Sequence, residues 1–445
     1  MFSRIKEVFR ERLSGKLHTN PSAYARMCGM LSIYPMPPGD MTDLDTLERS
    51  DRDSLRQRAE ELGPIFKGIA WDNLCVCVVG LELCQEITKT HMEHMSVHTL
   101  ELEHLIPKGF LSAMETKDHR HYRAIIQTAL NKQMAVSDEG VLDQIANTGL
   151  HFFAEKTNEH NDDADAFTRA LSRIATSMIA WVFFGAKPGT PVHERIIEHF
   201  QKLGPYGLVW NPQERQEKAF RAFQEYISTE ADTLKDGTGK LSSQGMLGQI
   251  ITQGELDETL IGNLIYQAEM GRFDIKNYFR WLSRHVADDP CILERIRKDE
   301  SIAFTSKKRS VAEAFALETL RTDQSENLIR RAKRDFIFKG LLIPKFTTIR
   351  LCLWEAHHDP ENFENPHQFD ATRFTETSPS KAQFSPFGLD KHQCPFGTPV
   401  IKMGTTFVRA LAQGYNLSQL TEGPEVRGPY HWEPAPKFAV HIEHL

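Results

Sequence analysis

A single cysteine, Cys394, lies in the segment FSPFGLDKHQCPFG (residues 384–397), where its surroundings could support chemistry. Pro395 follows it directly, and a helical pattern covers Thr398–Tyr415, so the sulfur is expected close to the start of a helix. The partial positive charge of a helix N-terminus lowers the pKa of a nearby thiol and favours the thiolate. The sequence therefore predicts a thiolate at this position.

The residues beside Cys394 limit the roles that the predicted thiolate could have. Gly388 and Gly397 relieve backbone constraints on a tight loop, and Phe387 and Phe396 can shield the sulfur from water. A shielded thiolate without a second cysteine or a local pair of histidines suits an axial ligand to heme iron. A catalytic nucleophile would instead need a general base nearby in space, and the residues alone leave that alternative open.

The elements that must position this loop are mainly helical. The longest pattern, Asp257–Ala287, contains no proline and would be on the order of 45 Å long as one helix. A shorter helix is expected over Ser310–Thr322, a strand within Trp71–Gly80, and β-like pieces between residues 335 and 353. We expect an N-terminal lead-in over residues 1–50 and a single domain over residues 51–445, with small sheets near both ends.

Composition excludes several classes of protein. With 40% apolar and 25% charged residues among 445, the chain has the composition of a soluble globular protein. A net charge of -7 argues against a nucleic-acid binder, and no apolar run approaches the roughly 18 residues of a transmembrane anchor. Seven cysteines, an odd number spread over the chain, indicate a reducing, cytoplasmic location and no disulfide framework.

The segment around Cys394 resembles the cysteine-ligand loop of the cytochrome P-450 superfamily, whose pattern is FGxGxHxCxG. The residues in register with that pattern are Phe387, Gly388, His392 and Cys394. Asp390 stands where the second glycine is usual. Phe396 stands where the last glycine is usual, with Gly397 one residue late.

Further segments resemble the family in the same order along the chain. Glu318 and Arg321 in ALETLRTDQSE match its ExxR motif, and their i, i+3 spacing places both on one helix face. Arg373 in FDATRF matches the family's meander arginine and is the expected third partner of that pair. The resemblance covers roughly Asp51 to the C-terminus. It implies a mainly α fold with small β-sheets, the single-domain cytochrome P-450 fold, a triangular prism with heme between the I and L helices.

The same resemblance implies how heme b (iron protoporphyrin IX) is held. Cys394 would be the axial ligand to the iron, with Phe387 and Gly388 in the loop beside the cofactor. The segment KDHRHYRAII resembles the HxxxR pattern of the family's C helix. The residues implied as contacts of the heme propionates are His119, Arg123, Arg330 and His392. Arginine and histidine suit that role because they form charge-assisted hydrogen bonds with carboxylates, and Arg330 has an adjacent arginine, Arg331.

The long helix corresponds to the family's I helix but departs from its pattern. The usual motif is [AG]GxxT with an acid before the threonine, and this acid–alcohol pair delivers protons for O–O cleavage. The chain has YQAEMGRFDIKNYFRW, with no serine or threonine from residue 260 to residue 282. With Gly271 as the motif glycine, Phe273 takes the acid position and Asp274 the threonine position.

Several interpretations of this departure are open. Asp274 could itself relay protons through water, with Gly271 leaving room for oxygen. A register shifted by one residue would instead put Arg272 and Phe273 there, as in peroxide-using members in which an arginine anchors a substrate carboxylate. A dehydratase or isomerase would need no proton relay. Glu269, Arg272 and Asp274 could also be no more than ion pairs on a helix face.

The resemblance implies a heme-thiolate monooxygenase that oxidises a small organic molecule, an intermediate of specialised metabolism, with dioxygen. Electrons are expected from separate partners, a ferredoxin and a ferredoxin reductase. Lys381, Lys391 and Lys402 near the cysteine loop are candidates for docking them. The alternatives are a P-450-fold peroxygenase, a dehydratase or isomerase, and a non-catalytic heme-binding module.

Overall fold

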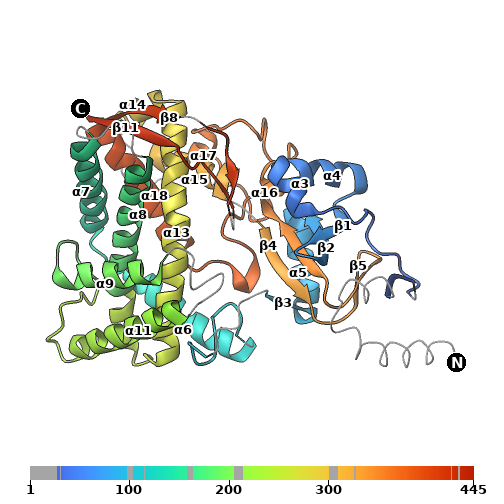
Figure 1. The fold of residues 1–445 in the computed structure, drawn as a ribbon, viewed down its shortest axis with the longest axis horizontal. Helices are drawn as coiled ribbons and strands as arrows, with labels where there is room; N and C mark the ends of the chain where they lie inside the picture. The colour runs from blue at the N-terminus through green and yellow to red at the C-terminus, as the bar shows by residue number, and fades with distance from the viewer. Residues whose placement is uncertain are drawn as a thin grey trace.

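A computed structural model describes residues 28–445 of the chain, apart from residues 31, 98–103, 115, 158–163, 205–213, 300–308, 325, 326, 422, 429 and 430. The described part is mainly helical, and most of its strands gather at one side of the molecule, as the right half of Figure 1 shows. The predicted class, mainly α with small β-sheets, is confirmed.

The helices range from a single turn to one helix of 31 residues. They are α3 (Leu44–Ser50), α4 (Ser54–Leu62), α5 (Leu81–His91), α6 (Thr116–Val136), α7 (Glu139–Thr157), α8 (Ala164–Ile179), α9 (Pro191–Leu203), α11 (Glu214–Lys235), α12 (Met246–Gln253), α13 (Glu258–Asp288), α14 (Cys291–Arg297), α15 (Val311–Thr319), α16 (Leu353–His357), α17 (Arg373–Glu376) and α18 (Gly397–Gly414). Short 3-10 turns are η1 (Met92–His94) and η4 (Asp390–His392), and π-turns are η2 (Ala180–Phe184) and η3 (Leu320–Gln324).

The strands form one sheet of five strands and three sheets of two strands. They are β1 (Ile65–Ala70), β2 (Asn73–Val79), β3 (Met95–Val97), β4 (Asn327–Ala332), β5 (Phe336–Phe338), β6 (Leu341–Ile343), β7 (Thr348–Cys352), β8 (Tyr415–Thr421), β9 (Val426–Arg427), β10 (Trp432–Glu433) and β11 (Ala439–His444). The large sheet has the order β1-β2-β7-β4-β3, and β2 and β7 are its one parallel pair among the described strands.

The long helix α13 crosses the helical part from end to end (Figure 1). The Asp257 side chain caps it by accepting a hydrogen bond from the backbone N–H of Leu260 at 2.7 Å. At 1.5 Å per residue its 31 residues span about 46 Å. Neighbouring elements cover most of the circumference of α13, so side chains such as Leu264 and Phe279 are fully buried. Residues on different faces of the helix therefore have different surroundings.

α18 begins three residues after Cys394 and ties the cysteine loop to the core. It packs against α7, α13 and α15. A side chain at Gly404 would lie 2.4 Å from the ring of Tyr278 on α13, so glycine at this position allows the two helices to approach closely. The cysteine loop is therefore held by a helix that is itself locked against α13.

Part of the stretch predicted as an N-terminal lead-in is packed against the sheet. Within residues 28–50, Leu44 of α3 is fully buried, and Glu48 is 2.6 Å from the guanidinium of Arg350 on β7. The division of the chain at residue 50 stays a prediction. Across the described residues, no helix is both long and apolar enough to cross a membrane.

Candidate active site

A cavity of about 560 Å³ opens between α13 and the cysteine loop. Its walls come from α6, α8, α13 and the segment that precedes α18, elements far apart in the sequence. Cys394 lines it from the loop, and Gly271 and Asp274 line it from α13. His119 and Arg123 reach it from α6. The volume lies in the range of small-molecule and cofactor pockets.

The loop around Cys394 is a tight turn closed by its own backbone. The N–H of Cys394 donates to the carbonyl oxygen of Phe387 at 2.8 Å. Gly388 has φ 85°, a left-handed conformation that glycine adopts without strain. A Cβ added at Gly397 would lie 2.8 Å from the ring of Phe387, so this glycine lets the aromatic ring pack under the loop. These contacts fix the direction in which the sulfur points.

The protonation of Cys394 differs from the sequence-based expectation. The sulfur is exposed to the cavity but closely surrounded by protein. Burial is the dominant cause and raises the pKa of the Cys394 thiol to about 11, although the N–H of Phe396 works in the opposite direction. The helix start alone therefore does not produce the predicted thiolate. A coordinating metal deprotonates a thiol outright, so the thiolate state depends on the metal.

Three of the residues implied as propionate contacts, His119, Arg123 and His392, line the cavity, and the charge of the fourth, Arg330, acts on the ring of His392. The rings of His119 and His392 are 4.6 Å apart. Burial, followed by the charges of His119 and Arg330, lowers the pKa of His392 to about 3. Arg123 donates to the carbonyl oxygen of Gln393 at 2.6 Å, which anchors it to the cysteine loop.

The structure distinguishes between the two adjacent arginines of β4. Arg330 is buried, and burial lowers its pKa to about 10, whereas Arg331 is exposed. The buried Nε of Arg330 and Nδ1 of His392 have no hydrogen-bond partner among the described residues. Buried donors without partners are costly and indicate a missing acceptor. The charges of Arg123 and Arg330, together with the open nitrogen atoms of Arg330 and His392, fit the two carboxylates of heme, and a free thiol facing the same cavity fits its iron.

The ExxR residues and Arg373 form a network of ion pairs that is largely buried. The guanidinium of Arg321 donates to both carboxylate oxygens of Glu318 at 2.7 and 2.8 Å, and both side chains are fully buried. Arg373 joins them through Nε, 3.1 Å from Glu318. Arg321 also donates to the carbonyl oxygens of His357 and Pro366. The network therefore ties α15 and η3 to the segment that leads into the cysteine loop.

On α13, Gly271 and Asp274 face the cavity. Burial raises the pKa of Asp274 to about 7, and the charge of Lys276 only partly offsets this effect. Near neutral pH the carboxyl group is therefore present in both its protonated and ionised forms. Gly271, the expected motif glycine, and Asp274, the acid three residues later, therefore lie on the same wall of the cavity.

Glu269 and Arg272 are not part of the cavity wall. Arg272 donates to both oxygens of Glu269 at 2.8 and 2.9 Å, and both side chains are buried. It also donates to the carbonyl oxygens of Phe200 and Gly204 at the end of α9. Their assignment as catalytic residues is therefore not supported, because their polar atoms are used to attach α9 to α13. The interpretation of this pair as a helix-face ion pair fits its position.

Lys402 also differs from its expected role. It is buried on α18, and its Nζ lies 2.5 Å from Glu139 of α7. It therefore joins two helices and is not available for docking. Lys381 and Lys391 are exposed.

Sequence reasoning missed His431, which lines the cavity from the segment before β10. Its Nε2 accepts a hydrogen bond from the side-chain amide of Asn277 at 2.7 Å, and burial lowers its pKa to about 3, so the ring is neutral. Tyr266 was missed as well. Its ring stacks on Phe110 at 3.7 Å. Neither belongs to a motif, and only the helical spacing of Tyr266, eight residues before Asp274, could have indicated its face.

Comparisons with known proteins agree with this geometry. The family model described as Cytochrome P450 matches residues 288–402. An abscisic acid 8'-hydroxylase from Solanum lycopersicum is 21% identical over 395 residues, 82% of each chain. Ent-kaurenoic acid oxidase 1 from Hordeum vulgare is 23% identical over 373 residues, 76% of this chain and 73% of that protein.

Solved structures share the fold at low identity. Cyanobacterial CYP120A1 with bound retinoic acid has a TM-score of 0.69 at 18% identity, over 93% of this chain and 100% of that chain. Cytochrome P450EX alpha with myristic acid has a TM-score of 0.67 at 16% identity, over 92% and 99%. Together with the cysteine loop, the ExxR network and the cationic edge of the cavity, these matches show that the chain belongs to the cytochrome P450 superfamily, as a heme-containing oxidoreductase of the monooxygenase type.

Proposed function

We propose that this protein is a heme-thiolate monooxygenase that hydroxylates an apolar small molecule with dioxygen and electrons from separate redox proteins. One observation carries the proposal. Cys394 and Asp274 face a single cavity from two different elements, one with a sulfur for iron and the other with a carboxyl group whose pKa is near neutrality. A thiolate ligand and a proton donor are the two protein groups that this chemistry needs.

The remaining residues of the cavity serve to hold the cofactor. His119, Arg123, Arg330 and His392 offer donors to the propionates, and Cys394 offers its sulfur to the iron. Phe387 and Gly388 shape the loop beneath it. When bound there, heme supplies the oxidising chemistry, while the protein orients it and excludes water.

Asp274 is our candidate for the distal proton donor. Gly271, one helical turn earlier, leaves space on the same wall, and the nearest atom to an added Cβ there is Ile179 Cδ1 at 3.3 Å. A group with a pKa of about 7 can both give and regain a proton at neutral pH. This carboxyl group would thus replace the acid–alcohol pair that the family uses.

The cavity favours an uncharged, apolar substrate. Its wall on the α8 and α13 side consists largely of side chains such as Ile179, Val182, Phe183 and Met270. Arg123, the one arginine or lysine among its described lining residues, belongs to the edge assigned to the propionates. Two relatives are named as oxidising enzymes of abscisic acid and ent-kaurenoic acid, and one similar solved structure has retinoic acid bound. For this chain we propose an apolar molecule without a charged group, such as an intermediate of specialised metabolism.

The peroxygenase alternative requires an arginine that anchors a substrate carboxylate. Arg272 is committed to Glu269 and to the backbone of α9, which argues against that role. The dehydratase or isomerase alternative and the non-catalytic heme module remain outcomes of the experiment below. For electron supply we propose a ferredoxin and its reductase, docked near Lys381 and Lys391, whose side chains are exposed.

The first test is the absorption spectrum of the dithionite-reduced, carbon monoxide-bound protein beside that of Cys394→Ser. A far red-shifted Soret band that disappears in the variant supports thiolate ligation, and a band typical of histidine-ligated heme refutes it. Turnover assays then separate the chemistries. Product formation that needs dioxygen and electrons supports the monooxygenase. Turnover with peroxide alone supports the peroxygenase, turnover with neither supports dehydration or isomerisation, and binding without turnover supports the heme module.

A further inference from the structure

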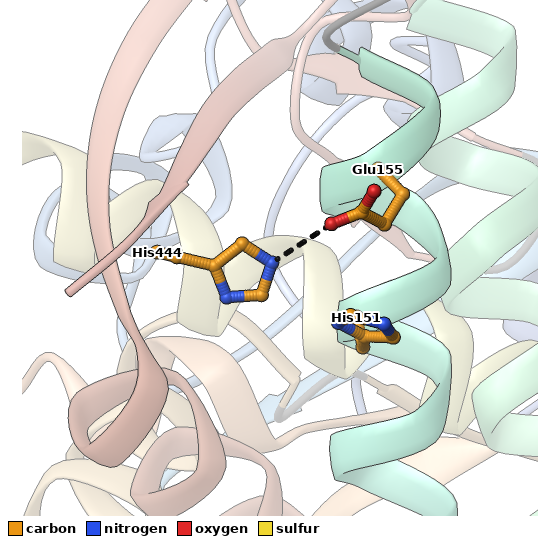
Figure 2. Close-up of side chains that lie close together, drawn as sticks. All are labelled: His151, Glu155 and His444. Carbon is orange, nitrogen blue, oxygen red and sulfur yellow. Dashed lines mark ion pairs between the residues drawn. The ribbon is translucent and has the colours of Figure 1, made fainter.

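Three side chains outside the heme cavity bring metal-binding atoms together on the surface. They are His151 and Glu155 of α7 and His444 of β11, and all three are exposed. One nitrogen or oxygen atom of each lies within 4.8 Å of those of the other two. Figure 2 shows the imidazole of His444 pointing across to α7, where Glu155 and His151 lie one above the other. None of the three lines the heme cavity.

The backbones that carry these side chains are fixed relative to one another. His151 and Glu155 are four residues apart, so they share one face of α7. His444 pairs with Tyr415 of β8 at the end of the antiparallel β8–β11 sheet, and β11 packs against α7. The buried ring of Tyr415 lies 4.9 Å from the ring of His444 and supports it from the side of β8. The cluster is therefore a product of the fold and not of a loose chain end.

The interactions within the cluster leave its ligand atoms available. The Nε2 of His444 is 3.5 Å from a carboxylate oxygen of Glu155, which is longer than a usual hydrogen bond. The rings of His151 and His444 are 5.3 Å apart at 59°. Among the described residues, the side chain of His151 makes this ring contact and no hydrogen bond. The one interaction drawn between these ligand atoms in Figure 2 is thus a long ion pair between exposed side chains, which a metal ion can replace.

We propose that His151, Glu155 and His444 bind a divalent transition-metal ion of the zinc class. Two imidazole nitrogens and one carboxylate oxygen are a ligand set that Zn²⁺ accepts, with water in the fourth position. Ligand atoms at about 2.0–2.1 Å from a tetrahedral zinc ion lie about 3.3 Å from each other. Closing the present separations by about 1.5 Å requires only small rotations of exposed side chains.

A bound ion would connect the end of the chain to the helical core. β11 ends at His444, one residue before the C-terminal Leu445, and α7 packs against α18, the helix that follows the cysteine loop. The ion would therefore join the β8–β11 sheet to α7 at a point outside the heme cavity. Since it would bind the folded chain and not the unfolded one, it should raise the melting temperature of the protein.

The test is calorimetric titration of the heme-loaded protein, first dialysed against EDTA, with ZnCl₂ and separately with MgCl₂. We expect one Zn²⁺ ion per chain and no Mg²⁺, because imidazole does not suit a hard cation. His151→Ala and His444→Ala should each weaken the Zn²⁺ affinity at least about tenfold. His441→Ala is the matched control. It removes a histidine of the same strand that contacts Glu443 and lies outside the cluster, and it should leave the affinity unchanged.

Two readouts besides affinity check the location of the ion. At a hundredfold excess of Zn²⁺ over its dissociation constant, the melting temperature should rise by about 3 °C in the wild type and the control but not in His444→Ala. The Soret band should stay unchanged, because the site is separate from the heme. No saturable Zn²⁺ binding, equal affinity in both cluster variants and the wild type, or a Soret change that accompanies binding would each overturn the proposal.

Discussion

Asp274→Asn tests the proposed proton donor with almost no change in shape. The amide has the size of the carboxyl group but cannot deliver a proton, so it separates packing from acid–base chemistry. Positioned acids and bases contribute about 10²–10⁴-fold to a reaction rate. We therefore expect product formation per heme to fall by that factor, which corresponds to about 3–5 kcal/mol of barrier.

The pH dependence gives a second signature of the same group. Its pKa of about 7 means that Asp274 is mostly protonated at pH 6 and mostly ionised at pH 8. If the protonated form donates, turnover of the wild type declines as pH rises through about 7, and the profile of Asp274→Asn lacks this decline. The assay measures product and released hydrogen peroxide against dioxygen consumed between pH 5.5 and 8.5. Asp288→Asn is the matched control, since it changes an exposed carboxylate that pairs with Arg284 on the same helix.

The same substitution has a consequence for stability that needs no substrate. Because the folded protein holds the proton of Asp274 more tightly than the unfolded chain, raising pH from about 4 to about 7 lowers the free energy of unfolding. A shift from 3.8 to about 7 corresponds to at most about 4 kcal/mol. The Asp274 side chain is exposed where it faces the cavity, so we discount this to about 1–2 kcal/mol.

Asp274→Asn escapes this loss. Its melting temperature should therefore gain about 1–2 °C relative to wild type between pH 4.5 and pH 8, as measured by thermal unfolding of the heme-loaded protein. Asp288→Asn should show no such trend. Turnover of Asp274→Asn within threefold of wild type, with the same pH profile and the same melting curve, would refute the assignment.

Three further substitutions test the surroundings of the heme. Arg321→Lys leaves a buried carboxylate poorly paired and should lower the free energy of unfolding in urea by about 3–5 kcal/mol. The control Glu294→Gln changes an exposed pair and should lower it by less than about 1 kcal/mol. Similar losses in the two variants would contradict the structural role of the ExxR network. Arg330→Met should speed heme transfer to an apoprotein scavenger about ten- to a hundredfold, because a charge-assisted hydrogen bond is lost, and equal transfer from Arg330→Met and Arg331→Met would argue against the propionate contact. Arg272→Met should lower the urea midpoint but keep product formation per heme within about threefold, and a selective loss of peroxide-driven oxidation of carboxylic acids would instead support the peroxygenase.

The sequence predicted the elements that carry motifs or strong periodicity. The expected helix Asp257–Ala287 is α13 shifted by one residue, because an aspartate cap and unbroken apolar spacing define it locally. The expected helix Ser310–Thr322 is α15 followed by the π-turn η3, and Ser310 caps its start. The strand expected within Trp71–Gly80 is β2.

Elements whose stability comes from distant partners were not predicted. β1 contains a lysine and a glycine in six residues and exists as a strand because it pairs with β2. β4 contains two adjacent arginines, and its pairing with β7 lets Arg330 be buried while Arg331 is exposed. Similarly, the burial that raises the pKa of Cys394 comes from protein that encloses the cavity, while the sequence shows only the nearby helix start. Local patterns do not contain this information.

Two aspartates stand where the family's pattern has other residues, and they differ in what they mean. Asp390 replaces a glycine and has φ 55°, a left-handed conformation that aspartate tolerates better than most residues. Its carboxylate accepts a hydrogen bond from Thr88, and its charge opposes the effect of burial on the pKa of Arg330. The backbone shape that the glycine serves is thus preserved.

Asp274 replaces a threonine, and here the backbone is unaffected because the position is an ordinary turn of α13. What changes is the side chain that faces the cavity, from an alcohol that passes protons to an acid that holds one near neutral pH. A mismatch with a motif therefore weakens an assignment only where it removes the property that the position supplies. In the cysteine loop that property is conformation and it is retained, so this mismatch does not weaken the proposal that Cys394 binds the iron. In α13 the property is proton transfer, so Asp274 decides whether the activity of this chain agrees with that of the family.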